Sequence, residues 1–149
     1  MATVEKTIEV DQPITTVYNQ WTQFETFPEF MRGVESVYQL DAKRLHWKAD
    51  IGFVKREWDA EITEQVPDQT IAWRSIGDVR NDGRVSFQPV TPDRTRVIVR
   101  FDYDPHGFIE KVGDKLNLVD QRVEEDLERF KDFIESRGPE TGAWRGEIR

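Results

Sequence analysis

Few ionisable residues in this chain of 149 residues suit catalysis. Histidine is the side chain best placed for acid–base chemistry near neutral pH, and the chain has two, His46 and His106. His46 falls on the polar face of an alternating segment, which predicts a surface position. His106 precedes the long C-terminal helical pattern, so it is either a helix-start residue or a group near a cavity entrance. Spacing identifies no partner for His106.

Arg56 is the most informative charged residue. Within Val54–Gln65 it shares a face with Trp58 and Ile62, and that apolar face predicts that Arg56 points inward. An inward guanidinium can hold a carboxylate, phenolate or carbonyl oxygen of a ligand through paired N–H donors. The alternatives are an ion pair with a nearby acid or a position near solvent at the strand end, since an unpaired buried charge is costly.

The sequence lacks the motifs of the common enzyme classes. We find no Ser-His-Asp arrangement in a recognisable context, no H-E-x-x-H and no acidic metal loop. Without cysteine there is no disulfide, thiolate nucleophile or thiolate metal site. The "NDG" at Asn81–Gly83 is interpreted as a hairpin turn and not as a phosphate-binding loop. We therefore expect no metal and no cofactor, and we assign no catalytic residue.

The composition restricts partners and compartment. The net charge is −8, and the 21 basic residues are interleaved with 29 acidic ones, which argues against nucleic acids and anionic membrane surfaces. The chain has no signal-peptide core and no apolar run that could span a bilayer. We expect a soluble cytoplasmic protein without stable membrane insertion. Five Trp and nine Phe distinguish it from a disordered chain.

Alternation of period two predicts seven strands. They are Thr3–Val10, Val34–Leu40, Leu45–Ile51, Phe53–Gln65, Thr70–Ile76, Gly83–Gln88 and Thr95–Tyr103. Short turn sequences separate the last six, which indicates an antiparallel meander.

Two short helices are predicted after the first strand, and one long helix near the end. The first is capped by Asp11 and carries Pro13 in its first turn, and the second covers Phe24 to Met31. From Phe108 to Arg137, apolar residues recur at steps of three and four and form one continuous stripe. We expect one domain over residues 1–137. The tail, 138–149, is expected to be loosely held apart from its tryptophan, Trp144, which docks on its own domain or contacts a partner protein.

These elements predict an α+β fold in which a curved seven-stranded antiparallel sheet wraps around one long helix. The two short helices then close one end. The aromatic residues concentrated in them are expected to form an apolar plug between sheet and long helix: Trp21, Phe24, Phe27 and Phe30.

Several segments resemble one known family. They are "VYNQWTQFETFPEFM", "RLHWKADIG", "REWDAEITEQVPDQTIAWRS" and the helix "GFIEKVGDKLNLVDQRVEEDLERFKDFIESR". Together they resemble bacterial polyketide cyclase/dehydrase-like proteins of the START-related, helix-grip superfamily, which also includes coenzyme Q-binding proteins and lipid-transfer domains. The resemblance covers Val4 to Arg137 and implies a deep cavity for hydrophobic molecules between sheet and long helix. It implies no single activity, since carriers and cyclases share this fold.

The inward faces of the predicted strands and helix give a set of cavity-lining, ligand-binding residues. They are Trp47, Arg56, Trp58, Trp73, Ser75, Phe87, Phe101, Tyr103, Val112 and Leu116. The alternative is a filled core, because aromatic residues at strand spacing are commonly structural. Gly113, close to the helix stripe where Ala would favour the helix more, supports a partly open pocket.

Three functions remain open at this stage. The sequence favours binding, without turnover, of a hydrophobic small molecule such as a polyketide, quinone, lipid or aromatic metabolite. The second is an aromatic polyketide cyclase or dehydrase that polarises a carbonyl group with Arg56, Ser75 or Tyr103. The third is a protein-interaction module. We expect a monomer or weak dimer, because no second apolar helical surface is evident.

Overall fold

The protein is described by a computed structural model, which covers residues 2–51, 54–77, 81–103, 115–137 and 140–149. It has one seven-stranded antiparallel sheet of strand order β1-β7-β6-β5-β4-β3-β2. The strands are β1 (Ala2–Val10), β2 (Val34–Gln39), β3 (Arg44–Ile51), β4 (Val54–Val66), β5 (Thr70–Ile76), β6 (Asn81–Thr91) and β7 (Arg94–Tyr103). The predicted sheet is thereby confirmed.

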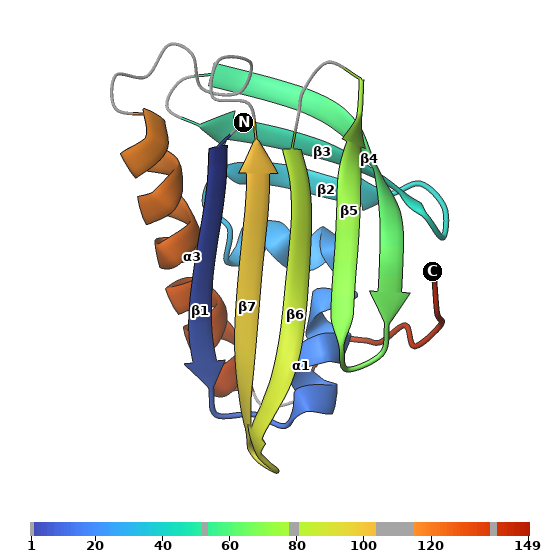
Figure 1. Cartoon of the computed structure of the whole chain (residues 1–149), viewed down its shortest axis with the longest axis vertical. Helices are drawn as coiled ribbons and strands as arrows, with labels where there is room; N and C mark the ends of the chain where they lie inside the picture. Colours follow the sequence, from blue (N-terminus) through green and yellow to red (C-terminus); the bar gives the residue numbers. More distant parts are fainter. Residues whose placement is uncertain (1, 52–53, 78–80, 104–114, 138–139) are drawn as a thin grey trace.

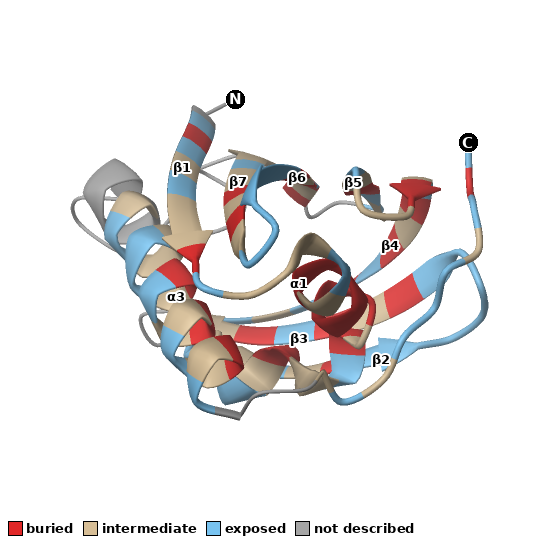
Figure 2. Cartoon of the chain, turned by 90° about the horizontal axis from the view of Figure 1, so that it is seen from below, coloured by how far each residue is buried: buried red, intermediate tan, exposed pale blue. Residues whose placement is uncertain are grey.

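The sheet bends strongly, so that β1, β7 and β6 face β3 and β2 across the interior (Figures 1 and 2). The long helix α3 (Lys115–Arg137) lies along the open side of this curve, beside β1. Helix α1 (Ile14–Trp21) and the 3₁₀ helix η1 (Phe24–Glu29) fill one end of it. This is the predicted helix-grip arrangement, with two short helices and one long one.

An aromatic plug, which we define as Trp21, Phe24, Phe27 and Phe30, joins the short helices to α3. All four side chains are buried, as predicted. The ring of Phe130 on α3 lies 5.1 Å from that of Trp21 and 5.0 Å from that of Phe30, centroid to centroid. Such edge-to-face and tilted pairs add to the burial of apolar area. The plug therefore fixes α3 against the rest of the fold.

The apolar stripe of α3 is buried over only part of its described length. Leu127, Phe130 and Ile134 are buried, whereas Val123, one turn earlier than Leu127, is partly exposed. Lys6 of β1 pairs with Asp120 and Glu124 in the same part of α3, at 3.0 and 3.8 Å.

Two local predictions were wrong. Asp11 does not cap α1: the N-cap is Pro13, and Asp11 instead donates its backbone N–H to Glu135 and pairs its carboxylate with Arg94. "NDG" is not a turn either, since Asn81 and Asp82 pair with the end of β7 as the first residues of β6. Pairing across the sheet overrides the local turn preference of these residues.

The described part of the C-terminal tail, residues 140–149, is tightly held, which corrects the expectation that only Trp144 would anchor it. Ile148 is buried and exchanges two backbone hydrogen bonds with Gln65 of β4, of 2.7 and 2.8 Å. Arg145 reaches Asp68 at 2.8 Å and lies over the ring of Tyr18. Trp144, by contrast, stays 39% exposed.

Buried polar side chains of α1 explain why the tail lies where it does. The amide of fully buried Gln20 bonds both the N–H and the hydroxyl of Thr141, at 2.9 and 3.0 Å. Asn19 bonds Glu140 and Arg145 in the same way. Because buried amides need partners, the tail satisfies polar groups that would otherwise destabilise α1.

A second polar cluster lies on the outer face of the sheet, where His46 stands opposite Asp59 in the register of β3 and β4. Its Nδ1 is 2.7 Å from Asp59 and its Nε2 is 3.1 Å from Glu57. The hydrogen bond to Asp59, followed by that to Glu57, raises the pKa of His46 above 6.5. His46 thus faces away from the interior, as predicted.

The tail gives a first prediction. Ile148→Ala should lower the free energy of unfolding by about 2 kcal/mol, because it removes a buried side chain from the contact with β4. Trp144→Ala is the control and should change it by less than about 0.5 kcal/mol, as for other partly exposed positions. Urea unfolding measures both. A larger loss for Trp144→Ala would contradict this account of the tail.

The His46 cluster gives a pH prediction. Since the folded pKa of His46 is above its unfolded value of 6.5, its stabilising contribution is complete below that value and is lost as pH rises through the folded pKa. The stability advantage of the wild type over His46→Gln should therefore be larger at about pH 5.5 than at about pH 9, as measured by urea unfolding. An advantage that is constant or grows with pH would contradict the ion-pair assignment.

Candidate functional site

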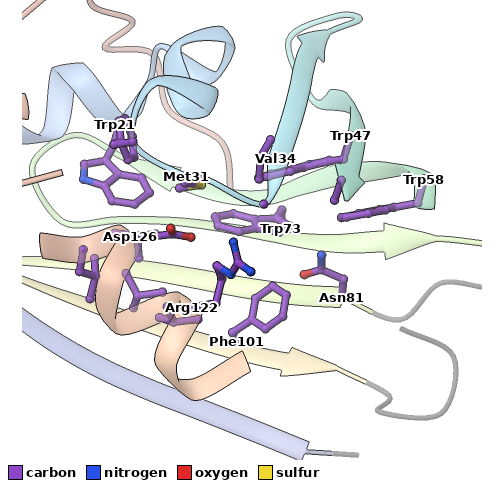
Figure 3. Close-up of a pocket in the computed structure, with 17 residues that line it drawn as sticks. Trp21, Met31, Val34, Trp47, Trp58, Trp73, Asn81, Phe101, Arg122 and Asp126 are labelled. Atoms are coloured by element: carbon purple, nitrogen blue, oxygen red, sulfur yellow. The ribbon is translucent and has the colours of Figure 1, made fainter. Parts of the chain in front are cut away.

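A cavity of about 120 Å³ opens between the inner face of the sheet and α3 (Figure 3). Its apolar lining comes from the plug, the segment between the plug and β2, the sheet and α3: Trp21, Phe30, Met31, Gly33, Val34, Trp47, Ala49, Trp58, Trp73, Val85, Val99, Phe101, Val123 and Leu127. Asn81, Arg122 and Asp126 are its polar lining residues. An apolar cavity of roughly 150 Å³ is large enough to bind benzene. This one therefore suits a small ring or one end of a larger molecule.

Three indole rings form a row along one wall. Trp47 and Trp58 are register partners on β3 and β4, and their rings lie parallel within 3° with centroids 5.9 Å apart. Trp73 of β5 continues the row, 5.9 Å from Trp47 and tilted by 28°. Alternation on three adjacent strands places all three side chains on the inner face. The three near-parallel indoles line one side of the cavity.

Gly83 of β6 provides the space for Trp73. The two residues are register partners, and a Cβ atom at position 83 would lie 2.3 Å from Cζ2 of Trp73. Only glycine lets the indole lie this close to the neighbouring strand. The position of Trp73 in the cavity wall thus depends on a residue that itself contributes no side chain.

The cavity wall carries polar atoms without partners. Within the described ranges, the indole Nε1 atoms of Trp21, Trp47 and Trp73 are buried and make no hydrogen bond, and nor does Oδ1 of Asn81. Buried polar groups are normally paired, because leaving one unpaired costs about 1–3 kcal/mol. Four such atoms belong to residues that line this cavity, so its wall departs from that rule.

Asp126 connects the cavity rim to the plug. Its carboxylate accepts hydrogen bonds from the guanidinium of Arg129 and from the backbone N–H of Arg32, the latter at 3.2 Å. Arg129 also donates to the carbonyl of Phe30 at 3.1 Å. Burial raises the pKa of Asp126, although the hydrogen bond from Arg129 acts in the opposite direction. The pair ties α3 to the segment between η1 and β2.

Some of the predicted cavity-lining residues line the cavity, and others lie elsewhere in the core. Trp47, Trp58, Trp73 and Phe101 line the cavity. Phe87 is buried against Tyr18, and Tyr103 is buried beside Phe101, with ring centroids 5.3 and 5.7 Å apart. Ser75 uses its Oγ to accept the backbone N–H of Asn81 at 3.1 Å.

The remaining predicted residues do not contribute described atoms to the cavity. Arg56 is not among its described lining residues: its guanidinium donates to the carbonyl of Lys55, in a surface hollow shared with Glu35 and Glu57. A long arginine can share the inward face of a strand and still carry its charged end to water. Val112, Gly113 and His106 lie outside the described residues, as does the side chain of Leu116.

Sequence reasoning missed the three polar lining residues. Arg122 and Asp126 flank the apolar stripe of α3, four residues apart, and the i, i+4 spacing places them on one side of the helix. That spacing relative to Val123 and Leu127 was the available signal. Asn81 was missed because "NDG" was interpreted as a turn.

The chain was compared with known proteins. A family model described as "Polyketide cyclase / dehydrase and lipid transport" matches residues 10–132. An uncharacterized 17.2 kDa protein of Streptomyces lincolnensis is 50% identical over an aligned length of 149 residues, and the match covers 99% of this chain and 99% of that one.

Two solved structures illustrate the shared fold. A START superfamily protein from Mycobacterium smegmatis superposes with a TM-score of 0.77 at 17% identity, over 90% of this chain and 97% of that one. A Streptomyces aromatase/cyclase superposes with a TM-score of 0.69 at 16% identity, over 92% and 96% of the two chains. At these identities the likeness is one of fold.

The contact between Gly83 and Trp73 gives a prediction. Gly83→Ala should destabilise the protein by roughly 1–3 kcal/mol, because the new methyl group and the indole cannot occupy their present positions together. In a Trp73→Phe background the same change should cost less. Urea unfolding of the wild type, the two single variants and the double variant measures this in a double-mutant cycle. An equal cost in both backgrounds would show that the indole is not what Gly83 accommodates.

Proposed function

The chain belongs to the polyketide cyclase/dehydrase and lipid transport family, and we propose that it binds a hydrophobic small molecule in the cavity between the sheet and α3. The observation that carries this proposal is the cavity wall, in which most lining residues are apolar and several are aromatic. Ligand pockets of proteins are typically of this kind, apolar with a few placed polar groups.

The shape of the wall suggests the class of ligand. The near-parallel indoles of Trp47, Trp58 and Trp73 line one wall, and an aromatic ring of a ligand can pack against them. Polyketides, quinones and aromatic metabolites contain such rings, and a lipid could place one apolar end in the same space. The volume of about 120 Å³ favours insertion of one part of the ligand.

The described lining residues favour binding without turnover. None of them is a histidine, serine, tyrosine or lysine. His46 lies on the outer face of the sheet, paired with Asp59 and Glu57, and Asp126 is engaged by Arg129. Among the described residues, the cavity therefore offers no evident general base with which to transfer a proton.

A cyclase or dehydrase is the second candidate, and one observation favours it. Arg122 lines the cavity, and a guanidinium can stabilise the negative charge that develops on a carbonyl oxygen during ring closure. Such a reaction relies on folding the substrate in the cavity and needs few ionisable groups.

The proposal also concerns the compartment, the oligomeric state and the partners of the protein. None of the described helices is long and apolar enough to cross a membrane. We expect it to act in the cytoplasm as a monomer or weak dimer, and its net charge of −8 argues against a nucleic-acid partner.

Native mass spectrometry of the protein purified from its own host, followed by organic extraction, tests this function. We expect one class of apolar molecule to remain bound. Val123→Phe should lose it, because the larger side chain fills the cavity, whereas Val90→Phe, at an exposed position of β6, should retain it. Thermal unfolding confirms that both variants fold.

The extracted molecule is then returned to the protein and its mass is followed with time. An unchanged mass supports binding alone, and a loss of water would favour the cyclase or dehydrase. If both variants retain the molecule, or both lose it to the same extent, its binding site lies outside this cavity.

A further inference from the structure

Arg122 is the one arginine among the described lining residues of the cavity, and its position differs from that of the surface arginines. It projects from α3 into the cavity, on the side of Trp73 and Phe101 (Figure 3). No residue in the described part of the chain accepts a hydrogen bond from it or lies within ion-pair distance of it. A guanidinium beside a largely apolar wall is poorly solvated, so an anionic partner there would be strongly favoured.

The acidic residues around Arg122 already have other partners. On α3, Asp120 and Glu124 pair with Lys6, at 3.0 and 3.8 Å. One helical turn further, Glu125 lies 3.9 Å from the guanidinium of Arg129, and Asp126 accepts a hydrogen bond from the same group. The charge of Arg122 also acts on Asp126, but that carboxylate is hydrogen-bonded to Arg129 and Arg32, so Arg122 has no ion pair of its own among the described residues.

Asn81 adds a second polar group to the same cavity. It is 3% exposed, and its Oδ1 has no hydrogen-bond partner within the described ranges. Its backbone N–H is held by Ser75, and its register partner on β7 is Tyr103, so the residue is fixed at the start of β6. Figure 3 shows its side chain directed into the cavity. A buried, fixed acceptor of this kind matches a hydroxyl donor.

We propose that Arg122 and Asn81 determine which ligands the cavity accepts. The ligand class is a planar aromatic molecule that carries an anionic oxygen, a carboxylate or phenolate, for Arg122 and a hydroxyl group for Asn81. The proposal rests on the proposed function, because it concerns the same cavity. It assigns to Arg122 the anchoring role that the strand pattern suggested for Arg56, which lies in the surface hollow instead.

The polar pair selects ligands by charge and hydrogen bonding, which the apolar wall does not. An aromatic wall accepts many rings of similar size, and such a pocket discriminates only weakly between ligands that differ by one methylene. A site with buried hydrogen-bonding groups rejects an analogue that lacks the matching group, because the protein group is then left unpaired. Arg122 and Asn81 are hence expected to discriminate between ligands with the same ring system.

The experiment compares 2-naphthoate with its neutral methyl ester, two probes with the same ring system. Their dissociation constants are measured by calorimetry at low ionic strength for the wild type, Arg122→Gln and Arg122→Lys. Arg74→Gln is the matched control, since Arg74 is exposed and 3.7 Å from Glu61 on the outer face. Thermal unfolding of each variant confirms that it is folded.

We expect the wild type and Arg74→Gln to bind the acid at least about tenfold more tightly than the ester. Arg122→Gln should lose this preference with ester binding changed by no more than about twofold, and Arg122→Lys should keep part of it because the charge remains. A preference that survives in Arg122→Gln, or a wild type that prefers the ester, would overturn the inference while leaving the cavity's function intact. Binding of neither probe would refute both.

The role of Asn81 is measured separately. The wild type should bind 6-hydroxy-2-naphthoate about tenfold more tightly than 2-naphthoate, since the hydroxyl donates to Oδ1. Asn81→Leu, which keeps the volume and removes the acceptor, should abolish that gain and leave 2-naphthoate binding in place. A gain that persists in Asn81→Leu, or no gain in the wild type, would refute the assignment of Asn81.

Discussion

The contact between the aromatic plug and Phe130 determines how the rest of the molecule is arranged. Phe130 packs against Trp21 and Phe30, and the three rings are almost completely buried. This contact holds the second half of α3 against the short helices. Val123, nearer the beginning of α3, is only partly buried and lines the cavity. The cavity thus lies next to the packed core, where α3 and the sheet are no longer filled by side chains.

Buried polar groups that stabilise the fold differ from those around the cavity in whether they have a hydrogen-bond partner. Gln20 and Asn19 are buried and hydrogen-bonded to the tail, and Asp126 is hydrogen-bonded to Arg129 and Arg32. These groups stabilise the fold, because each has its partner inside the protein. Around the cavity, by contrast, Asn81 Oδ1 and several indole N–H groups have none among the described residues. Stability alone does not account for polar atoms left in that state.

Much of the fold could be predicted from sequence because period-two and helical patterns report directly on which face is buried. The plug, the indole row of Trp47, Trp58 and Trp73, and the outward position of His46 all followed from such patterns. Asn81 did not, because the local preference of "NDG" for a turn is weaker than its pairing with β7.

Residues whose role depends on distant partners could not be predicted from local patterns. The tail is held by Gln20 and Gln65, which lie far from it in sequence. Arg56 shares the strand face that points inward, but its length carries the charge out to the surface hollow. Arg122 enters the cavity beside the helix stripe, where the amphipathic pattern alone gives no preference.

The central claim, that the cavity between sheet and helix is the ligand site, is tested most directly by NMR of the indole N–H groups. Four of the five tryptophans line the cavity, and the fifth, Trp144, lies on the tail. On titration with methyl 2-naphthoate, the account predicts that the signals of Trp21, Trp47, Trp58 and Trp73 shift while that of Trp144 does not. A shift confined to Trp144, or none at all, would contradict it.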